Sequence, residues 1–140
     1  MAMLAACTST PQANRGSDQS AKEFATHPGY STVYVYRQST DNHFDDSVLY
    51  VDGRLIGTTL PGGYFLLNLQ PGRHQLNGVG PDQGRMTLET RSDALHFVRL
   101  SLVGGYSHFE EIPEKSGRSE LSRCCALLEN WAPGQRPLLR

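Results

Sequence analysis

The chain contains few of the residues that mark a catalytic, metal-binding or membrane-spanning protein. Its 140 residues include only three cysteines, Cys7, Cys124 and Cys125, too few for a disulfide framework and without metal-ligand spacing. No apolar run approaches the roughly 20 residues of a membrane-spanning helix. Thirteen basic residues face 14 acidic ones, a net charge of −1, so the chain lacks the positive field that attracts nucleic acid. We therefore expect one domain with no nucleic-acid partner and no cofactor.

Motifs of catalysis are equally scarce. The sequence contains no Gly-x-Ser-x-Gly, His-Glu-x-x-His or Cys-x-x-Cys pattern. The glycine-rich residues 78–84 lack the Lys-Ser/Thr pair of a phosphate-binding loop. His43, Asp45 and Asp46 form the one loop that could bind a divalent metal, but a closed site needs about four ligands. We expect no metal site and no enzyme, and a metal-dependent hydrolase that uses this loop remains the minor alternative.

Short apolar and β-branched runs dominate the middle of the chain. They alternate with Gly, Pro and Asp turns at close spacing, which is typical of a sandwich or barrel. The predicted strands span residues 32–37, 47–51, 54–58, 64–69, 73–79, 85–90, 94–102 and 106–112. The predicted fold is mostly β: a small antiparallel β-sandwich of about seven to eight strands.

Two turn dipeptides predict two hairpins. Asp52-Gly53 favours a type I′ turn, in which both central residues need a positive φ. Pro71-Gly72 predicts a second hairpin between residues 64–69 and 73–79. In that register His74 points toward the core, and we interpret it as a half-buried imidazole bonded to a neighbouring loop backbone. The side chains on the core face of this hairpin are those of Phe65, Leu67, Leu69 and Leu76.

Gly104 and Gly105 predict the last hairpin. Its register places Val98, Leu100 and Leu102 on one face. On the other face Arg99 lies opposite Glu110, where a cross-strand ion pair would contribute only tenths of a kcal/mol. The two histidines of this hairpin, His96 and His108, point to opposite faces and are interpreted as surface or edge residues.

The end of the chain changes from strand to helix periodicity. Leu121, Cys124, Cys125 and Leu128 fall at i, i+3, i+4 and i+7, which predicts one C-terminal amphipathic helix packed on the sheet and ended by Pro133. Adjacent cysteines rarely bond to each other, because the bond demands unusual backbone geometry. We interpret both thiols as small buried hydrophobes, with a redox pair as the alternative.

The start of the chain carries a motif that indicates the location of the protein. Leu4-Ala5-Ala6-Cys7 matches the lipobox of bacterial lipoproteins, in which the cysteine is lipidated. Only three residues precede it, too few for a full signal peptide, so we expect a truncated start, a start codon assigned too late, or a chance match. Thr8 follows the cysteine, and by resemblance to enterobacterial lipoproteins this favours the outer membrane.

The expected domain organisation follows from these segments. Residues 1–7 are the remnant of a signal peptide that ends in the lipobox cysteine. Residues 8–29 are rich in Ser, Thr, Gln, Asn, Pro and Gly and read as a flexible polar tether. Residues 30–130 form the β-sandwich domain with its helix, and residues 131–140 form a tail.

Six tyrosines are many for a chain of this length. Tyr34 and Tyr36 share one face of the strand at residues 32–37, while Val33 and Val35 share the other. Tyrosine offers a large contact area with few rotatable bonds and is enriched where partners dock. We therefore predict a partner-contact face at Tyr34 and Tyr36, with the edge of the core as the alternative place for these rings.

One resemblance rests on the turn motifs. The order Val51-Asp52-Gly53-x-x-Ile56-Gly57, Gly62-Gly63-Tyr64-Phe65 and Pro71-Gly72-x-His74 resembles a family of bacterial lipoproteins catalogued as domain of unknown function 2846. It is also similar to PEGA-type domains, although their Pro-Glu-Gly-Ala motif is absent here. The resemblance covers roughly residues 31–112. It implies a small β-sandwich, an exported location and no catalytic residues to carry over.

Three functional hypotheses remain after these observations. The favoured one is a non-enzymatic binding or scaffold module, held by lipid on Cys7 at the periplasmic face of the outer membrane. Its partner would be an envelope protein or peptidoglycan, and its only contact with the membrane would be the anchor. The main alternative is an inhibitor or immunity-type protein that blocks an envelope enzyme, and the third is the hydrolase already described.

Overall fold

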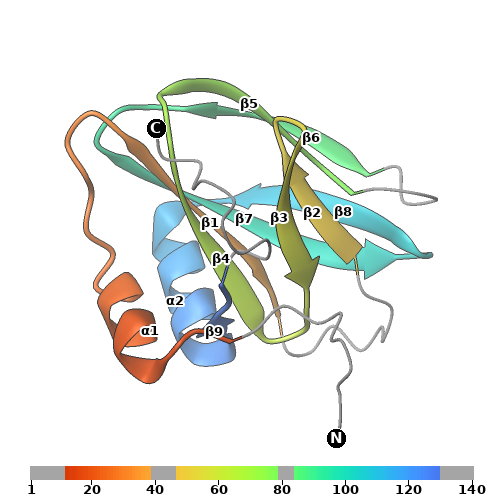
Figure 1. The fold of residues 1–140 in the computed structure, drawn as a ribbon, viewed down its shortest axis with the longest axis horizontal. Helices are drawn as coiled ribbons and strands as arrows, with labels where there is room; N and C mark the ends of the chain where they lie inside the picture. The colour runs from red at the N-terminus through yellow and green to blue at the C-terminus, as the bar shows by residue number, and fades with distance from the viewer. Residues whose placement is uncertain (1–11, 39–46, 79–83, 130–140) are drawn as a thin grey trace, which may run out of the picture.

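The computed structural model describes residues 12–38, 47–78 and 84–129, which contain nine strands and two helices. The mostly β fold predicted from the sequence is confirmed (Figure 1). In chain order the elements are α1 (Arg15–Ala21), β1 (Ser31–Arg37), β2 (Ser47–Val51), β3 (Arg54–Thr59), β4 (Gly63–Leu69), β5 (Gly72–Asn77), β6 (Arg85–Thr90), β7 (Ala94–Val103), β8 (Tyr106–Ile112), α2 (Glu114–Cys124) and β9 (Ala126–Leu127).

The strands form two sheets that share one hydrophobic core. One sheet has the order β8-β7-β1-β4-β9, and the other has the order β3-β2-β5-β6. Because successive side chains of a strand point to opposite faces, alternate residues of each strand enter this core. The predicted core residues all lie in it, which confirms the sandwich: Phe65, Leu67, Leu69, Leu76, Val98 and Leu100.

Two of the predicted hairpins are present. β2 and β3 pair across Asp52 and Gly53, whose φ angles of 52° and 79° are both positive, as the Asp-Gly pair predicts. β7 and β8 pair across Gly104 and Gly105 in the predicted register. Local turn chemistry was sufficient here because each turn joins strands that are neighbours in one sheet.

The predicted hairpin across Pro71 and Gly72 is wrong. β4 pairs with β1 and β9, whereas β5 pairs with β2 and β6, so the chain crosses between the sheets at this turn. The chain bends at Pro71, and Gly72 has a φ of 134°, a backbone conformation that favours glycine. Both sheets face the same core, and Leu69 and Leu76 are therefore buried in either arrangement. The burial pattern could not distinguish a hairpin from a crossing.

The five-stranded sheet is mixed, which differs from the antiparallel arrangement predicted. β1 pairs in parallel with β7, and β4 pairs in parallel with β9. Hairpin turns impose antiparallel pairing only on strands that follow each other directly. β1 and β7 are separated by the whole second sheet, so no turn fixes their relative direction.

α2 packs on the outer face of the five-stranded sheet, as the helical stripe predicts. It ends at Cys124, before the predicted end at Pro133, because Cys125 is extended with φ −135° and ψ 150°. Gly117 and Leu121 are its buried residues. A Cβ on Gly117 would collide with the ring of Phe97, so this glycine lets the helix approach β7 closely.

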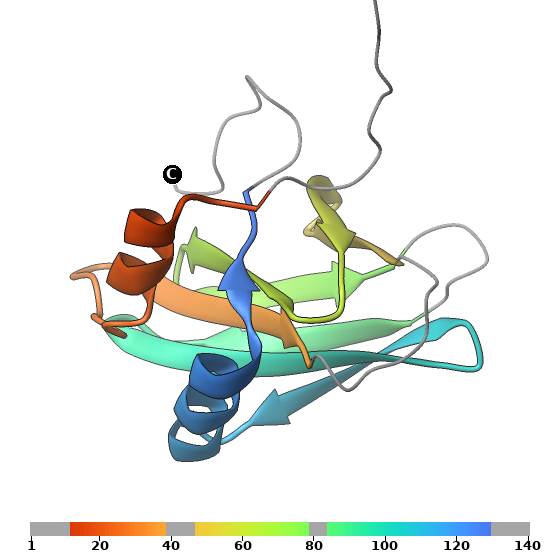
Figure 2. The ribbon, with the colours of Figure 1, turned by 90° about the horizontal axis from the view of Figure 1, so that it is seen from below.

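A second helix, α1, precedes β1 and lies next to β9 (Figure 2). The predicted flexible tether over residues 8–29 is therefore wrong for residues 12–29. The side chain of Asn14 caps α1 by accepting a hydrogen bond from the Ser17 amide at 2.8 Å. Ala21 is buried against the sheet, and most other residues of α1 are exposed. The polar composition thus reflects the outer face of a helix.

The described helices have 7 and 11 residues, and neither is long and apolar enough to cross a membrane.

Candidate functional site

The helices cover the face on which the sequence placed a partner-contact surface. Tyr34 and Tyr36 project from β1 toward the helical layer, and each is 1% exposed. The expectation that they form an exposed face is wrong, because α1 covers Tyr34 and α2 covers Tyr36. The Tyr34 hydroxyl donates to the Ala21 carbonyl at 2.5 Å, and burial raises the pKa of Tyr34 to about 12.

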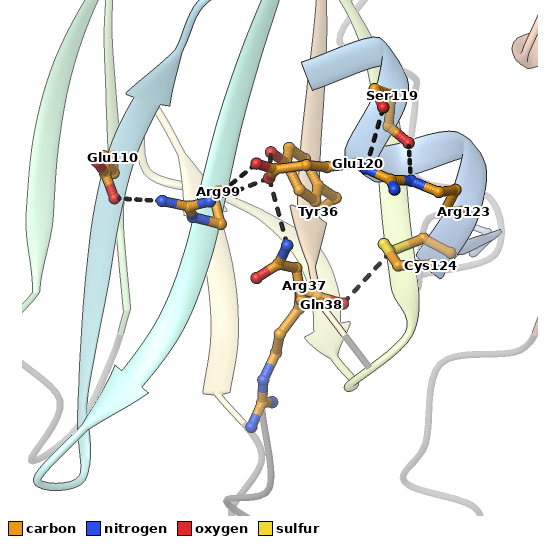
Figure 3. Close-up of polar contacts among 10 residues, drawn as sticks. Tyr36, Arg37, Gln38, Arg99, Glu110, Ser119, Glu120, Arg123 and Cys124 are labelled. Atoms are coloured by element: carbon orange, nitrogen blue, oxygen red, sulfur yellow. Dashed lines mark hydrogen bonds and ion pairs between the residues drawn. A yellow bond between two sulfur atoms is a disulfide. The ribbon is translucent and has the colours of Figure 1, made fainter. Parts of the chain in front are cut away.

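An ionic network ties α2 to the same face of the sheet (Figure 3). Glu120 accepts hydrogen bonds from the Tyr36 hydroxyl at 2.5 Å and from Gln38 Nε2 at 3.3 Å. Arg99 Nη1 lies 3.0 and 3.2 Å from the two Glu120 oxygens, and Arg99 Nη2 lies 2.9 Å from Glu110, which confirms the predicted Arg99–Glu110 pair. Burial and the neighbouring Glu120 carboxylate raise the pKa of Tyr36, so its hydroxyl stays a donor. The network fixes the position of α2.

A second polar cluster joins α1 to β9 and β4. Asp18 accepts hydrogen bonds from the Tyr64 hydroxyl at 2.6 Å and from the Leu127 amide at 3.1 Å. Lys22 Nζ lies 3.1 Å from Asp18 and donates to the Cys125 carbonyl at 2.5 Å. Burial raises the pKa of Asp18, but these donors together lower it below its ordinary value. The ionised carboxylate therefore holds three elements together.

A groove of about 790 Å³ opens beside α1 on this side of the molecule. Ser17 and Ser20 of α1 line one wall with hydroxyl groups. Leu66 and Leu127, which are partly exposed, line it from the sheet and give it an apolar floor beside the buried ring of Tyr34. The rest of the lining is mixed, with Glu23, His27 and Thr32 beside Ala21 and Ala25.

The groove lies against the part of β4 that β9 leaves unpaired. Within the described residues β9 pairs only with Gly63 and Tyr64 of β4. The Tyr64 carbonyl faces outward, because it accepts from the Leu128 amide at 2.8 Å. Alternate residues of a strand direct their main-chain groups to the same side, so those of Leu66 and Asn68 face outward too. Such an edge can pair with an extended segment of another chain.

Two of the residues assigned to turn structure, Asp52 and His74, are in contact. Asp52 Oδ2 lies 2.5 Å from His74 Nδ1, and Asp52 Oδ1 accepts from the Gln75 amide at 2.9 Å. His74 Nε2 lies 2.6 Å from the Gln70 carbonyl. Burial lowers the pKa of His74, but the Asp52 carboxylate and the Gln70 carbonyl raise it overall. Both ring nitrogens are engaged in local contacts, which matches the interpretation of a half-buried imidazole bonded to a loop backbone.

His96 is buried, at 4% exposure, which corrects its interpretation as a surface residue, whereas His108 is exposed. The Nε2 atom of His96 accepts a hydrogen bond from the Arg91 amide at 3.1 Å, and the Nδ1 atom of His96 lies 3.8 Å from Glu111. Burial lowers the pKa of His96. With Glu114 these residues line a second pocket of about 400 Å³. The pocket carries charges of both signs, so its electrostatics favour neither an anion nor a cation.

Cys124 and Cys125 are bonded to each other in a disulfide. This corrects the expectation that the adjacent thiols stay unbonded. The physical reason is the extended conformation of Cys125, which leaves the helix and turns its side chain toward that of Cys124. Cys125 is 6% exposed, and its Sγ lies 3.5 Å from the Arg37 carbonyl.

Several sequence-based candidates lie outside the described residues. These are the lipidation site Cys7 and the His43, Asp45 and Asp46 loop. Within residues 12–38, 47–78 and 84–129, no group of three or more His, Cys, Asp or Glu side chains could hold a metal ion.

The groove is the feature that sequence reasoning missed. Its wall is a short helix with polar exposed residues, and composition alone assigns such a segment to a linker. The available signal was Asn14, a favoured N-cap residue three positions before Ser17, followed by Ala21 and Phe24 at helical spacing.

Comparisons with known proteins place these features in context. A family model described as a protein of unknown function, DUF2846, matches residues 27–111. An uncharacterized protein from Haemophilus influenzae (strain ATCC 51907 / DSM 11121 / KW20 / Rd) is 25% identical over 127 residues, which cover 86% of this chain and 76% of that protein. No solved structure matches the chain.

Proposed function

Because the chain belongs to the DUF2846 family, whose function is unknown, we propose a function from the chain itself. In this proposal the protein is lipid-anchored in the bacterial cell envelope and is held at the periplasmic face of the outer membrane through Cys7. Its folded domain is a non-enzymatic module that binds a segment of another envelope protein.

The observation that carries the binding role is the groove between α1 and β4. It combines an apolar floor at Leu66 and Leu127 with hydroxyl groups from Ser17 and Ser20. The outward main-chain groups of Leu66 and Asn68 lie at the same edge of the sheet. An extended polypeptide uses both features at once, since its main chain pairs with a strand edge while its side chains enter the groove.

Two features support a location in the cell envelope. Leu4-Ala5-Ala6-Cys7 matches the lipobox and precedes the folded residues by a few positions. The Cys124–Cys125 disulfide suits an oxidising compartment such as the periplasm, because disulfides are rare where glutathione and thioredoxin keep thiols reduced.

Site-specific crosslinking in cells tests the binding role. A photoreactive residue at Ser20, in the groove, should crosslink to an envelope protein. The same residue at Thr87, exposed on β6 of the other sheet, is the matched control and should not give that product. Equal crosslinking from both positions, or none from Ser20, would contradict the groove as the binding site. A one-to-one complex with an enzyme whose activity falls would indicate an inhibitor, and capture of peptidoglycan would replace the protein partner.

Fractionation tests the anchor separately. With a full signal peptide, the chain should enter the membrane fraction, and Cys7→Ala should release it, since two or more acyl chains give stable anchoring. Cys124→Ala is the control and should stay with the membrane. If the Cys7→Ala variant also stays there, the lipid anchor is wrong.

A further inference from the structure

α2 ends between two cysteines that are bonded to each other. Cys124 is its last residue, and Cys125 is extended. Adjacent side chains on an α-helix point about 100° apart around its axis and do not face each other. A disulfide requires the two Cβ atoms to lie about 3.5–4.5 Å apart. The bonded pair is therefore incompatible with a helix that continues through Cys125.

The sequence after the pair otherwise favours a longer helix. Ala126, Leu127 and Leu128 all have high helix propensity, and no Gly or Pro follows until Pro133. The spacing of Leu121, the cysteines and Leu128 is helical, and for that reason the sequence predicted a helix through this region. In the structure Leu128 instead enters the core between the sheets and is 7% exposed. The disulfide and the burial of Leu128 thus oppose the local helical preference.

The conformation after Cys125 also determines how α1 is held. β9 follows directly from the end of α2 and passes beside α1 (Figure 2). Lys22 donates to the Cys125 carbonyl at 2.5 Å, and the Leu127 amide donates to Asp18 at 3.1 Å. The Leu127 carbonyl accepts from the Ala13 amide at 2.8 Å, and Leu127 lines the groove. A helix in place of β9 would remove all of these contacts.

We propose that the Cys124–Cys125 pair is a site of thiol–disulfide exchange whose oxidation state controls β9 and, through it, the groove. The control of binding rests on the function proposed for that groove. The disulfide keeps β9 against β4 and α1. Reduction removes the constraint, so β9 detaches more often and the wall of the groove loosens. The reacting partner is a dithiol–disulfide protein of the envelope.

The exchange is balanced in atoms and electrons. Cys124 is partly exposed and Cys125 is buried, so a thiolate of the reduced partner attacks the Cys124 sulfur. The bond between the two cysteines breaks, and Cys125 leaves as a thiolate that takes a proton. The second thiol of the partner then attacks the mixed disulfide and releases Cys124. Two electrons and two protons pass from the partner, which becomes the disulfide. The reduced Cys125 has an acceptor in place, since its Sγ lies 3.5 Å from the Arg37 carbonyl.

Hydrogen exchange with mass spectrometry tests the proposal on the full chain with Cys7→Ala, in which the pair holds the only two cysteines. The oxidised protein should contain no free thiol, and dithiothreitol should expose two. In the oxidised form the Ala126 and Leu128 amides donate to the Gly62 and Tyr64 carbonyls and should be protected. Reduction should speed their exchange by about tenfold or more and leave β8 unchanged.

A double variant, Cys124→Ser with Cys125→Ser, should exchange like the reduced protein and ignore dithiothreitol. Two free thiols after oxidation, or equal exchange at Ala126 and Leu128 in both redox states, would overturn the proposal. Neither readout needs a partner, so failure here is distinct from failure of the groove crosslink. If crosslinking from Ser20 is equal in the oxidised and the reduced protein, the groove stands as the binding site, but the cysteine pair does not control it.

Discussion

Asp52 Oδ2 and His74 Nδ1 lie 2.5 Å apart and join the turn between β2 and β3 to β5. The other ring nitrogen of His74 lies 2.6 Å from the Gln70 carbonyl. A carboxylate and a carbonyl both accept hydrogen bonds, and only the protonated imidazole has two N–H donors. The folded protein therefore favours the imidazolium, and the pKa of His74 rises above its ordinary value of 6.5.

We expect this contact to make stability depend on pH in the neutral range. Because the folded-state pKa of His74 is raised, its contribution is fully present below about pH 6.5 and is lost as the pH rises through the folded-state pKa. His74→Gln should lower the free energy of unfolding by about 1 kcal/mol at low pH, as for a partly exposed charged hydrogen bond. Urea unfolding between about pH 5.5 and 9 should show the difference shrinking as the pH rises.

Asp52→Asn is the matched variant for this contact. Asparagine keeps a side-chain oxygen for the Gln75 amide and tolerates the positive φ of this position, but it removes the charge. The pH dependence contributed by His74 should flatten in this variant. A stability difference between wild type and His74→Gln that grows above pH 7 would contradict the protonated form.

The neighbouring Gly53 should be sensitive to branching at Cβ. Its φ is 79°, and a Cβ built there has no atom within 4 Å apart from its chain neighbours, so contacts with the rest of the protein do not oppose a Cβ. Gly53→Val should still lower the free energy of unfolding by about 1–3 kcal/mol, because a β-branched residue is strained at positive φ. Gly53→Asn should cost clearly less. Equal losses in thermal unfolding would show that backbone strain is not the cause.

The contrast between the two predicted hairpins shows how far sequence reasoning reaches. Asp52-Gly53 joins strands of one sheet, and its local chemistry was sufficient to predict them. Pro71-Gly72 joins strands of different sheets, and both sheets bury the same alternating residues in one core. Sequence patterns specify which face of a strand is buried. They do not specify which strand pairs with it, because that depends on contacts far apart in the chain.

The tyrosines illustrate the same limit for the candidate site. The alternation of Tyr34 and Val35 correctly placed them on opposite faces of β1. Whether Tyr34 is exposed depends on α1, a 7-residue helix with exposed polar residues around Ala21. Periodicity is weak over so short a helix. The groove, which this helix walls, was therefore not predicted.

Glu120 should stabilise the protein more than Glu110, although both contact Arg99. The side chain of Glu120 is 23% exposed and also accepts from Tyr36 and Gln38, whereas that of Glu110 is 52% exposed. Glu120→Ala leaves the buried Tyr36 hydroxyl without this acceptor and should cost about 1–3 kcal/mol. Glu110→Ala should cost only tenths of a kcal/mol. Denaturant unfolding of both variants checks this order, and a larger loss for Glu110→Ala would contradict it.

Two helical glycines should respond to alanine in opposite directions. Gly117→Ala adds a Cβ that collides with Phe97, so we expect a loss of about 1–3 kcal/mol despite the higher helix propensity of alanine. Gly16 in α1 has only Asn14 Oδ1 near its Cβ, at 3.4 Å, so Gly16→Ala should be neutral or stabilising. Thermal unfolding separates the two outcomes. A neutral Gly117→Ala would show that α2 lies farther from β7.

The segment before β1 should contribute to folding and should not behave as a dispensable tether. The centroid of the Phe24 ring lies 5.3 Å from the centroid of the Tyr34 ring and 5.8 Å from that of the Phe97 ring. Phe24→Ala should lower the free energy of unfolding by about 2 kcal/mol, less than for a fully buried ring because Phe24 is only partly buried. Thr26→Ala, at an exposed position close by, is the control and should change it by less than about 0.5 kcal/mol.

Removal of residues 1–28 should cost more than Phe24→Ala alone. It would expose the ring of Tyr34 and take Asp18 away from the Tyr64 hydroxyl and the Leu127 amide. The loss removes the packing of Ala21 and Phe24 on the sheet and the hydrogen bonds that hold β9 on its outer side. We expect a melting temperature lower by about 10 °C or more, measured by circular dichroism. A chain that begins at Gly29 and melts within a few degrees of the full protein would restore the tether interpretation and remove the wall of the proposed groove.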